Sequence, residues 1–186
     1  LREMLHCVDH YCELVPTVGP HEVTDFHRSL AQALDNDTLD VLYLCIERNA
    51  ILVSDDASLR LLAPEAGVAI SMGVQPVLME ACNKDFLSKD AYVDTVVGKL
   101  VAGHDFVTVQ SQDLFTLAKR TPARVSEDAK IALDTFRKPT LDIASGVQVS
   151  CEFLMHAIER LQPAVAAAYG KHILEALQYE RPQLHR

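Results

Sequence analysis

The chain has 186 residues, 49% of them hydrophobic, which is enough apolar material for the core of one domain with or without a helical extension. Its formal net charge of −9 argues against binding of polyanions over the whole surface, although it is compatible with a local basic groove. No apolar run approaches the roughly 18 residues that span a bilayer, and no signal peptide opens the sequence, so we expect a cytoplasmic protein without a membrane segment.

The five cysteines are odd in number and widely spaced, without a C-x-x-C pair, which is typical of a reduced protein rather than of a disulfide framework. Near the start, His6, Cys7, His10 and Cys12 lie close together and include the residue types of a zinc site. Four ligands from one short helix cannot converge on one ion, so we expect ordinary, partly buried side chains there. Because the sequence begins with Leu1, we expect it to be a piece of a longer chain.

Spacings of three and four between apolar residues predict three helices in the first part of the chain. The first covers residues 1–14, and a loop at residues 15–21 separates it from the second. The stretch Asp35-Asn36-Asp37 ends the second helix and caps the third, which ends near Asn49. We expect Asp40 in the first turn of this helix, either as a site residue close to the next strand or as a surface acid that complements the helix dipole.

A polar turn follows a short buried strand at the centre of the sequence. Residues 50–53 are aliphatic and predict the strand, and Ser54, Asp55 and Asp56 come directly after it. Ligand sites in open α/β sheets lie beyond the carboxyl ends of strands, so this turn is the candidate site. The alternative is that the two aspartates serve only the next helix, one as its cap and one as an acid in its first turn.

The next helix is predicted to end at Pro64 and Gly67, and a second strand is predicted at residues 67–71. A short strand–helix–strand unit favours parallel pairing of the two strands. The elements that follow are two helices, a third strand and a further helix, predicted at residues 73–83, residues 88–101, residues 106–109 and from Ser111 onward.

Beyond Thr121 every segment reads as a helix, with prolines at the joints, where the first turn of a helix tolerates them. We therefore predict an α/β domain at residues 1–121 and an all-helical C-terminal region at residues 122–186. That region is expected to pack on the first domain or on a second copy of the chain. Its helices are predicted at residues 126–138, 140–161 and 163–179.

The sequence contains no nucleophile elbow, no P-loop and no dinucleotide fingerprint. The remaining candidate chemistry is a set of carboxylates formed by Asp40, Asp55 and Asp56. Carboxylates are hard oxygen ligands that suit Mg²⁺ or Mn²⁺. Such an ion lowers the pKa of a bound water and stabilises charge on a phosphodiester.

These features follow one another in an order that resembles the second half of a PIN domain, over roughly residues 22–120. An acid on a helix precedes a strand, which is followed by S-D-D-x-x-L-R, a helix that ends near a glycine, and a short strand. A helix with a tyrosine then precedes a last strand. The matching stretches are Asp40 to Glu47, Leu52 to Asp56, Leu59-Arg60, Ala66 to Val68, Asp90 to Leu100 and His104 to Val109.

The resemblance implies an α/β fold, with a short parallel sheet flanked by helices, and a ribonuclease site in which about four acids surround one or two divalent ions. By position, Asp40 matches the acid on the helix before the strand, and Asp55 or Asp56 matches the acid after it. Glu22 would stand in for the family's second acid. Asp9 would stand in for the first acid, because no strand ahead of residue 15 ends in an aspartate.

The first function hypothesis is a Mg²⁺- or Mn²⁺-dependent ribonuclease that cleaves RNA phosphodiester bonds. Its metal ligands would be Asp40, Asp55, Asp56 and Glu22. Its contacts to the RNA backbone would be Arg60, Lys119 and Arg120.

The second hypothesis is a degenerate, non-catalytic PIN-like module for interaction or regulation, which dimerises through the C-terminal helices or belongs to a larger parent protein. The acidic balance and the missing first acid favour this module, whereas the intact S-D-D turn and Asp40 favour the ribonuclease. A third alternative is an α/β domain without phosphate chemistry.

Overall fold

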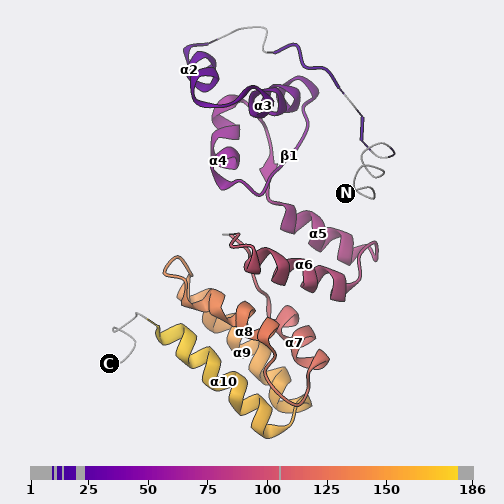
Figure 1. The fold of residues 1–186 in the computed structure, drawn as a ribbon, viewed down its shortest axis with the longest axis vertical. Coiled ribbons are helices and arrows are strands. Elements are labelled where there is room, and N and C mark those ends of the chain that lie inside the picture. Colours follow the sequence, from indigo (N-terminus) through magenta and orange to yellow (C-terminus); the bar gives the residue numbers. More distant parts are fainter. Residues whose placement is uncertain (1–9, 11, 14, 20–23, 105, 180–186) are drawn as a thin grey trace. The chain divides into compact units, whose positions relative to one another are not determined.

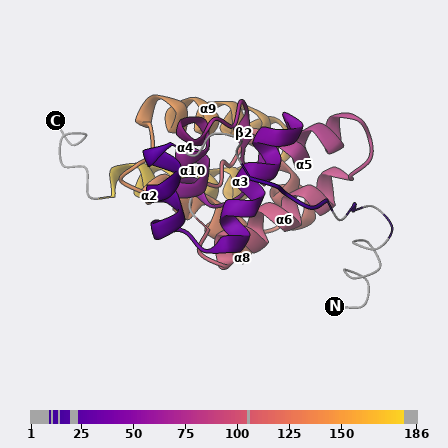
Figure 2. The same cartoon turned by 90° about the horizontal axis from the view of Figure 1, so that it is seen from above.

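The computed structural model describes residues 10, 12–13, 15–19, 24–104 and 106–179. The chain forms two compact units, Leu1–Pro76 and Val77–Arg186. Figure 1 and, from above, Figure 2 show the order of the elements. The boundary that the sequence predicts at residues 121–122 lies inside the second unit, between two helices that pack on each other. The predicted division into a domain at residues 1–121 and a helical region at residues 122–186 stays a prediction.

The described part of the first unit contains helices packed around a two-stranded sheet. Its elements are α2 (Asp25–Ala33), α3 (Asn36–Arg48), β1 (Leu52–Val53), α4 (Ala57–Ala66) and β2 (Ser71–Met72), and α5 (Val74–Asn83) contains the division between the units. The predicted helix at residues 1–14 lies almost entirely outside the described residues.

The two strands pair in parallel, with Leu52 opposite Ser71 and Val53 opposite Met72, as the strand–helix–strand unit predicts. The second strand begins later than the predicted residues 67–71, because the end of α4 uses the first of these residues. Gly67 adopts a left-handed φ of 100°, and the N–H of Val68 turns back to the carbonyl oxygen of Ala63 at 2.9 Å. The first unit is thus α/β, with a very short parallel sheet.

Pro64 does not end α4, as the sequence predicts, but lies inside it. A proline has no N–H, so the carbonyl oxygen four residues earlier, that of Arg60, receives no helical hydrogen bond. The hydroxyl of Ser71 donates to this oxygen at 3.1 Å. The helix therefore continues past the proline to Ala66, because β2 supplies the missing donor.

Apolar residues of α2, α3 and α4 form the core of the first unit together with β1. Leu42 is fully buried in it, and Cys45 is nearly so. Burial raises the pKa of the Cys45 thiol. Asp35 caps α3 by accepting the N–H of Thr38 at 2.9 Å, and Asn49 ends it in a left-handed conformation, both as predicted. Among the described residues of this unit, those buried in its core are Leu30, Leu39, Leu42, Cys45, Leu52, Ala63, Ala66 and Val68.

The described part of the second unit is helical, and its helices surround one core. Ser88 caps its first helix and Ser126 its third, at the positions expected from the sequence. The last two helices lie side by side (Figure 1). Only two residues join them. The elements are α6 (Lys89–Val101), α7 (Ser111–Arg120), α8 (Glu127–Asp134), the 3₁₀ turn η1 (Thr135–Arg137), α9 (Ile143–Arg160) and α10 (Pro163–Gln178).

The third predicted strand, at residues 106–109, is wrong, because β1 and β2 are the only strands among the described residues. Phe106 adopts a left-handed φ of 62°, which breaks the extended conformation at the start of the segment. Helices, rather than a strand, surround the segment in the second unit, and it lines a cavity of about 510 Å³ beside the start of α9. Val109, one of the apolar residues of this segment, is buried.

Tyr169 is buried in the core of the second unit, and its ring meets that of Phe153 edge to face at 5.0 Å between centroids. Its hydroxyl has no hydrogen-bond partner among the described residues, and burial raises its pKa to about 12. We predict that Tyr169→Phe leaves the free energy of unfolding unchanged or raises it by up to about 1 kcal/mol, because an unsatisfied polar group is removed. Tyr169→Ala should lower it by about 3–5 kcal/mol. Urea unfolding measures both, and a loss above 1 kcal/mol in Tyr169→Phe would contradict the unsatisfied hydroxyl.

Several exposed carboxylates have a pKa below the ordinary value, because the folded chain donates hydrogen bonds to them. The N–H and the hydroxyl of Thr38 lower the pKa of Asp35, and the hydroxyl and N–H of Ser145 lower that of Asp142. A lowered folded pKa stabilises the fold above the unfolded value, and this contribution is lost as the pH falls through the folded value. The same direction holds for Glu47, Glu127 and Glu152.

We therefore predict that the urea midpoint falls as the pH is lowered from about 6 to about 3. In Asp35→Asn the helix cap keeps its acceptor oxygen but no longer titrates, so this variant should lose less stability over the same interval. A parent midpoint that is constant over this interval would contradict the prediction.

Candidate functional site

The S-D-D turn lies between β1 and α4, where the sequence predicts it. Asp56 caps α4: its Oδ1 accepts the N–H of Ser58 at 2.8 Å and that of Leu59 at 3.2 Å. Ser54 Oγ accepts the N–H of Asp56 at 3.1 Å. One of the two aspartates is thus the predicted cap, but the predicted acid in the first turn is wrong, because Asp55 precedes the cap. Two backbone donors hold the Asp56 carboxylate in a defined orientation.

Asp55 reaches a second helix. Its Oδ1 accepts the N–H of Val74, the first residue of α5, at 3.2 Å. Val74 follows β2 with one residue between them, just as Asp55 follows β1. Two adjacent carboxylates therefore accept N–H groups at the starts of two helices, each of which follows a strand of the same parallel pair. The sequence predicts a role in one helix only.

The side chain of Arg60 binds the turn itself. Its Nη1 donates to the carbonyl oxygen of Ser54 at 2.6 Å, and the side chain is partly buried. The guanidinium also lies close to Gly73, where an added Cβ would be 3.8 Å from Nη1. Sequence reasoning missed this role, and the contact of Arg60 with an RNA phosphate stays a prediction.

Asp40 is exposed on α3, in its second turn rather than in the predicted first. Among the described residues, no group of three or more His, Cys, Asp or Glu side chains is arranged to hold a metal ion. The structure brings together the adjacent pair Asp55 and Asp56, and Glu22 lies outside the described residues. Metal binding by these four residues stays a prediction.

The chemistry of the aspartate pair fits a hard divalent cation. Mg²⁺ is often held by one or two carboxylates and keeps several waters. Each carboxylate offers about four lone pairs, so a group that caps a helix through Oδ1 retains capacity for a cation. Asp56 is exposed and Asp55 partly so. The first 76 residues contain twelve aspartates and glutamates, four arginines and no lysine, which favours cations near this unit.

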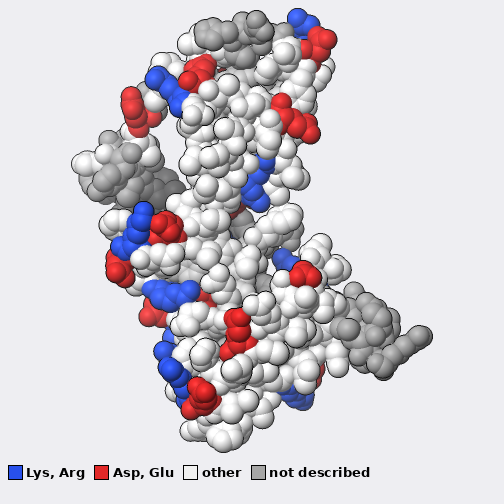
Figure 3. Space-filling model, turned by 180° about the vertical axis from the view of Figure 1, so that it is seen from behind, with Lys and Arg blue, Asp and Glu red and all other residues white. Residues whose placement is uncertain are grey.

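Acidic and basic side chains are interspersed on the face drawn in Figure 3. The residues coloured there form no broad basic patch of the kind that binds nucleic acid non-specifically. Binding of RNA to the residues coloured on this face would therefore depend on local contacts or on a bound cation.

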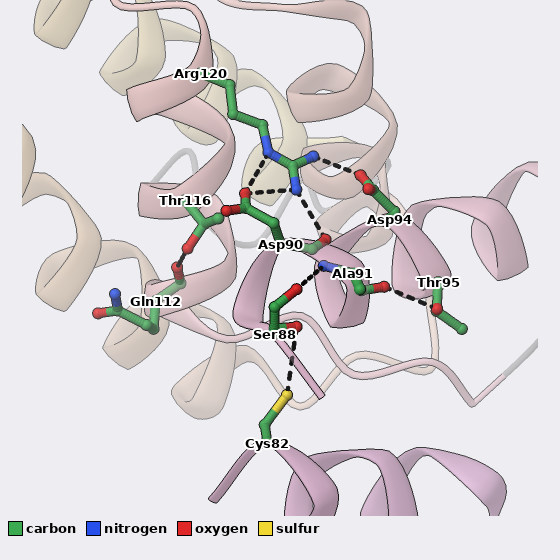
Figure 4. Close-up of polar contacts among 9 residues, drawn as sticks. All are labelled: Cys82, Ser88, Asp90, Ala91, Asp94, Thr95, Gln112, Thr116 and Arg120. Atoms are coloured by element: carbon green, nitrogen blue, oxygen red, sulfur yellow. Dashed lines mark hydrogen bonds and ion pairs between the residues drawn. The ribbon is translucent and has the colours of Figure 1, made fainter. Parts of the chain in front are cut away.

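Lys119 and Arg120, predicted to contact RNA, lie on α7 in the second unit. Nε of Arg120 donates to Asp90 Oδ1 at 2.8 Å, and Nη1 to Asp94 Oδ1 at 2.5 Å, as Figure 4 shows. Although burial acts to lower it, the pKa of Arg120 is raised by its hydrogen bonds to these two aspartates. Lys119 Nζ lies 4.5 Å from the centre of the Phe115 ring. Arg120 thus joins α7 to α6, and RNA contact by either residue stays a prediction.

We predict that Arg120→Met lowers the free energy of unfolding by about 1 kcal/mol, a modest value because both aspartates are mostly exposed. Arg120→Lys should recover only part of this loss, because an ammonium cannot reproduce the planar set of donors. The exposed Arg124 provides a matched control, and Arg124→Met should change the urea midpoint little. Equal midpoints for Arg120→Met and Arg124→Met would argue against the Arg120 contacts.

Residues 1–65 match a family model described as a PIN domain associated with the TPR-GreAB-C-PIN system. No curated protein and no solved structure matches the chain. The matched stretch contains α2, α3, β1, the S-D-D turn and α4 up to Glu65. The chain therefore contains a limited PIN-like segment, as its sequence predicts. The match begins earlier than the predicted residues 22–120 and ends before β2, so the resemblance of the later residues stays a prediction.

None of the described helices combines the length and the apolar character needed to cross a membrane. The described cysteines, Cys12, Cys45, Cys82 and Cys151, are free thiols.

Proposed function

We propose that the PIN-like segment contributes to a divalent-metal-dependent ribonuclease site, in which Asp55 and Asp56 hold Mg²⁺ or Mn²⁺. The observation that supports this proposal is the pair of accessible carboxylates at the end of β1, inside the stretch that matches a PIN domain. When bound, the metal would supply an activated water and stabilise charge on the phosphodiester.

The protein's own contribution would be orientation. The N–H groups of Ser58, Leu59 and Val74 hold the two carboxylates, so their oxygens are placed before a cation arrives. The excess of acids in this unit repels an RNA backbone, and a bound divalent ion would reduce that repulsion. We therefore infer that RNA binding depends on the metal.

The test must remove carboxylate charge without removing a helix cap, since Asp56 provides both. Asp56→Ser keeps an oxygen that accepts the N–H groups of the first turn. We predict that Asp56→Ser, and Asp55→Asn, weaken Mn²⁺ binding of the full chain at least tenfold in calorimetry, where a tenfold change corresponds to about 1.4 kcal/mol. The urea midpoint of Asp56→Ser should change little.

Asp35→Ser is the matched control, because it makes the same exchange at the cap of α3. Its Mn²⁺ affinity should equal that of the parent. The proposed metal site would be refuted by either of two results. Asp56→Ser and Asp55→Asn could bind Mn²⁺ as tightly as the parent, or the folded parent could bind no Mn²⁺. Cleavage of single-stranded RNA with Mn²⁺, lost in Asp56→Ser but not in Asp35→Ser, would extend the result from binding to activity.

The second candidate function is a non-catalytic PIN-like module for protein interaction. The capping bonds give Asp55 and Asp56 a structural reason to be present without a metal. Apolar side chains at the first strand also lie in solvent, with Val53 in β1 and Ile51 just before it about half exposed, whereas parallel sheets are usually covered on both faces. A folded parent that binds no Mn²⁺ but sediments as a dimer would favour this function.

A further inference from the structure

Arg60 stands at a position that is electrostatically unfavourable for a cation. It is the fourth residue of α4, close to the positive end of the helix dipole. The side chain turns back toward the start of the helix, and its Nη1 donates to the carbonyl oxygen of Ser54 at 2.6 Å. A specific contact therefore accounts for an arginine at this place.

The guanidinium lies close to the residues that precede both partners of the bond between Asp55 and Val74. Ser54 immediately precedes Asp55, and Gly73 immediately precedes Val74. Nη1 is bonded to the first of these residues, and Nη1 and Cζ are 3.8 and 3.9 Å from a Cβ built on the second. Arg60 is thus bonded to the residue before the acceptor of the 3.2 Å bond that holds Asp55, and it lies near the residue before the donor.

The backbone from which this side chain extends is itself fixed. The N–H of Arg60 donates to the carbonyl oxygen of Asp56 at 3.1 Å. Its own carbonyl oxygen accepts from Ser71 Oγ at 3.1 Å. The guanidinium therefore extends from a point that is bonded both to the turn and to β2.

We propose that Arg60 is a positioning residue of the candidate metal site, which orients Asp55 and Asp56 by holding Ser54 at the start of the turn. This inference rests on the proposed function. A positioning role of Arg60 differs from a contact with RNA phosphate and from a purely electrostatic role. A nearby cation repels Mn²⁺, so its removal would tighten metal binding if charge alone mattered. Loss of a positioning group weakens binding instead.

The experiment measures Mn²⁺ affinity of the full chain by calorimetry in Arg60→Met, Arg60→Lys and the control Arg48→Met. Arg48 is exposed at the end of α3, so its substitution removes the same charge without touching the turn. We expect Arg60→Met to bind Mn²⁺ about tenfold more weakly, as when partners of metal ligands are removed. Arg60→Lys should be intermediate, and Arg48→Met should bind as tightly as the parent or slightly more tightly.

Parent-like or tighter binding by Arg60→Met would overturn the positioning role while leaving the metal site standing. A higher KM for RNA with unchanged Mn²⁺ affinity would also overturn it, since that result assigns Arg60 to the substrate.

A second readout tests the positioning role without metal. The amides of Ser58 and Val74 donate to Asp56 and Asp55, and their hydrogen exchange reports how firmly the turn is held. In Arg60→Met both amides should exchange about tenfold faster, whereas the amide of Thr38, which donates to Asp35, should be unchanged. Equal exchange in parent and Arg60→Met would overturn the inference. If the parent binds no Mn²⁺, the proposed function fails, and this exchange still decides whether Arg60 holds the turn.

Discussion

The bonds from the first N–H groups of α4 and α5 to adjacent aspartates are the interaction on which the first unit depends. A helix leaves its first N–H groups without partners in the helix, and each needs an acceptor from elsewhere. Each of the two parallel strands is followed by the start of a helix, and both helix starts need acceptors. Asp56 serves the helix that follows its own strand, and Asp55 serves the helix that follows the other strand. One pair of consecutive residues therefore links the turn, the sheet and two helices.

This arrangement gives the same carboxylates a structural and a potential chemical role. A metal ligand must be fixed and accessible, and the capping bonds satisfy the first requirement. The exposure of Asp56 satisfies the second. Loss of either carboxylate would therefore disturb the fold as well as any bound ion, and only a substitution that keeps the acceptor separates the two effects.

The sequence predicts those features that depend on neighbouring residues. The caps Asp35 and Ser88 are local hydrogen bonds at predicted helix starts, and Asp56 is the residue of the predicted S-D-D turn that caps α4. Residues 106–109 have the composition of a strand, but a strand also needs a partner, which composition does not reveal. The partner of Asp55 depends on how β1 and β2 come together, so it is invisible in the sequence. For the same reason a motif of acids predicts candidate ligands but not their distances.

A hydrogen-bond donor that is missing at Pro64 is replaced by one at Ser71, and this links the two positions. Pro64 leaves the carbonyl oxygen of Arg60 without a helical donor, and the hydroxyl of Ser71 replaces it. A chain with alanine at position 64 would supply that donor itself and would release the requirement for a hydroxyl at position 71. The two positions are therefore expected to vary together during evolution, and their covariation would record this bond in sequences alone.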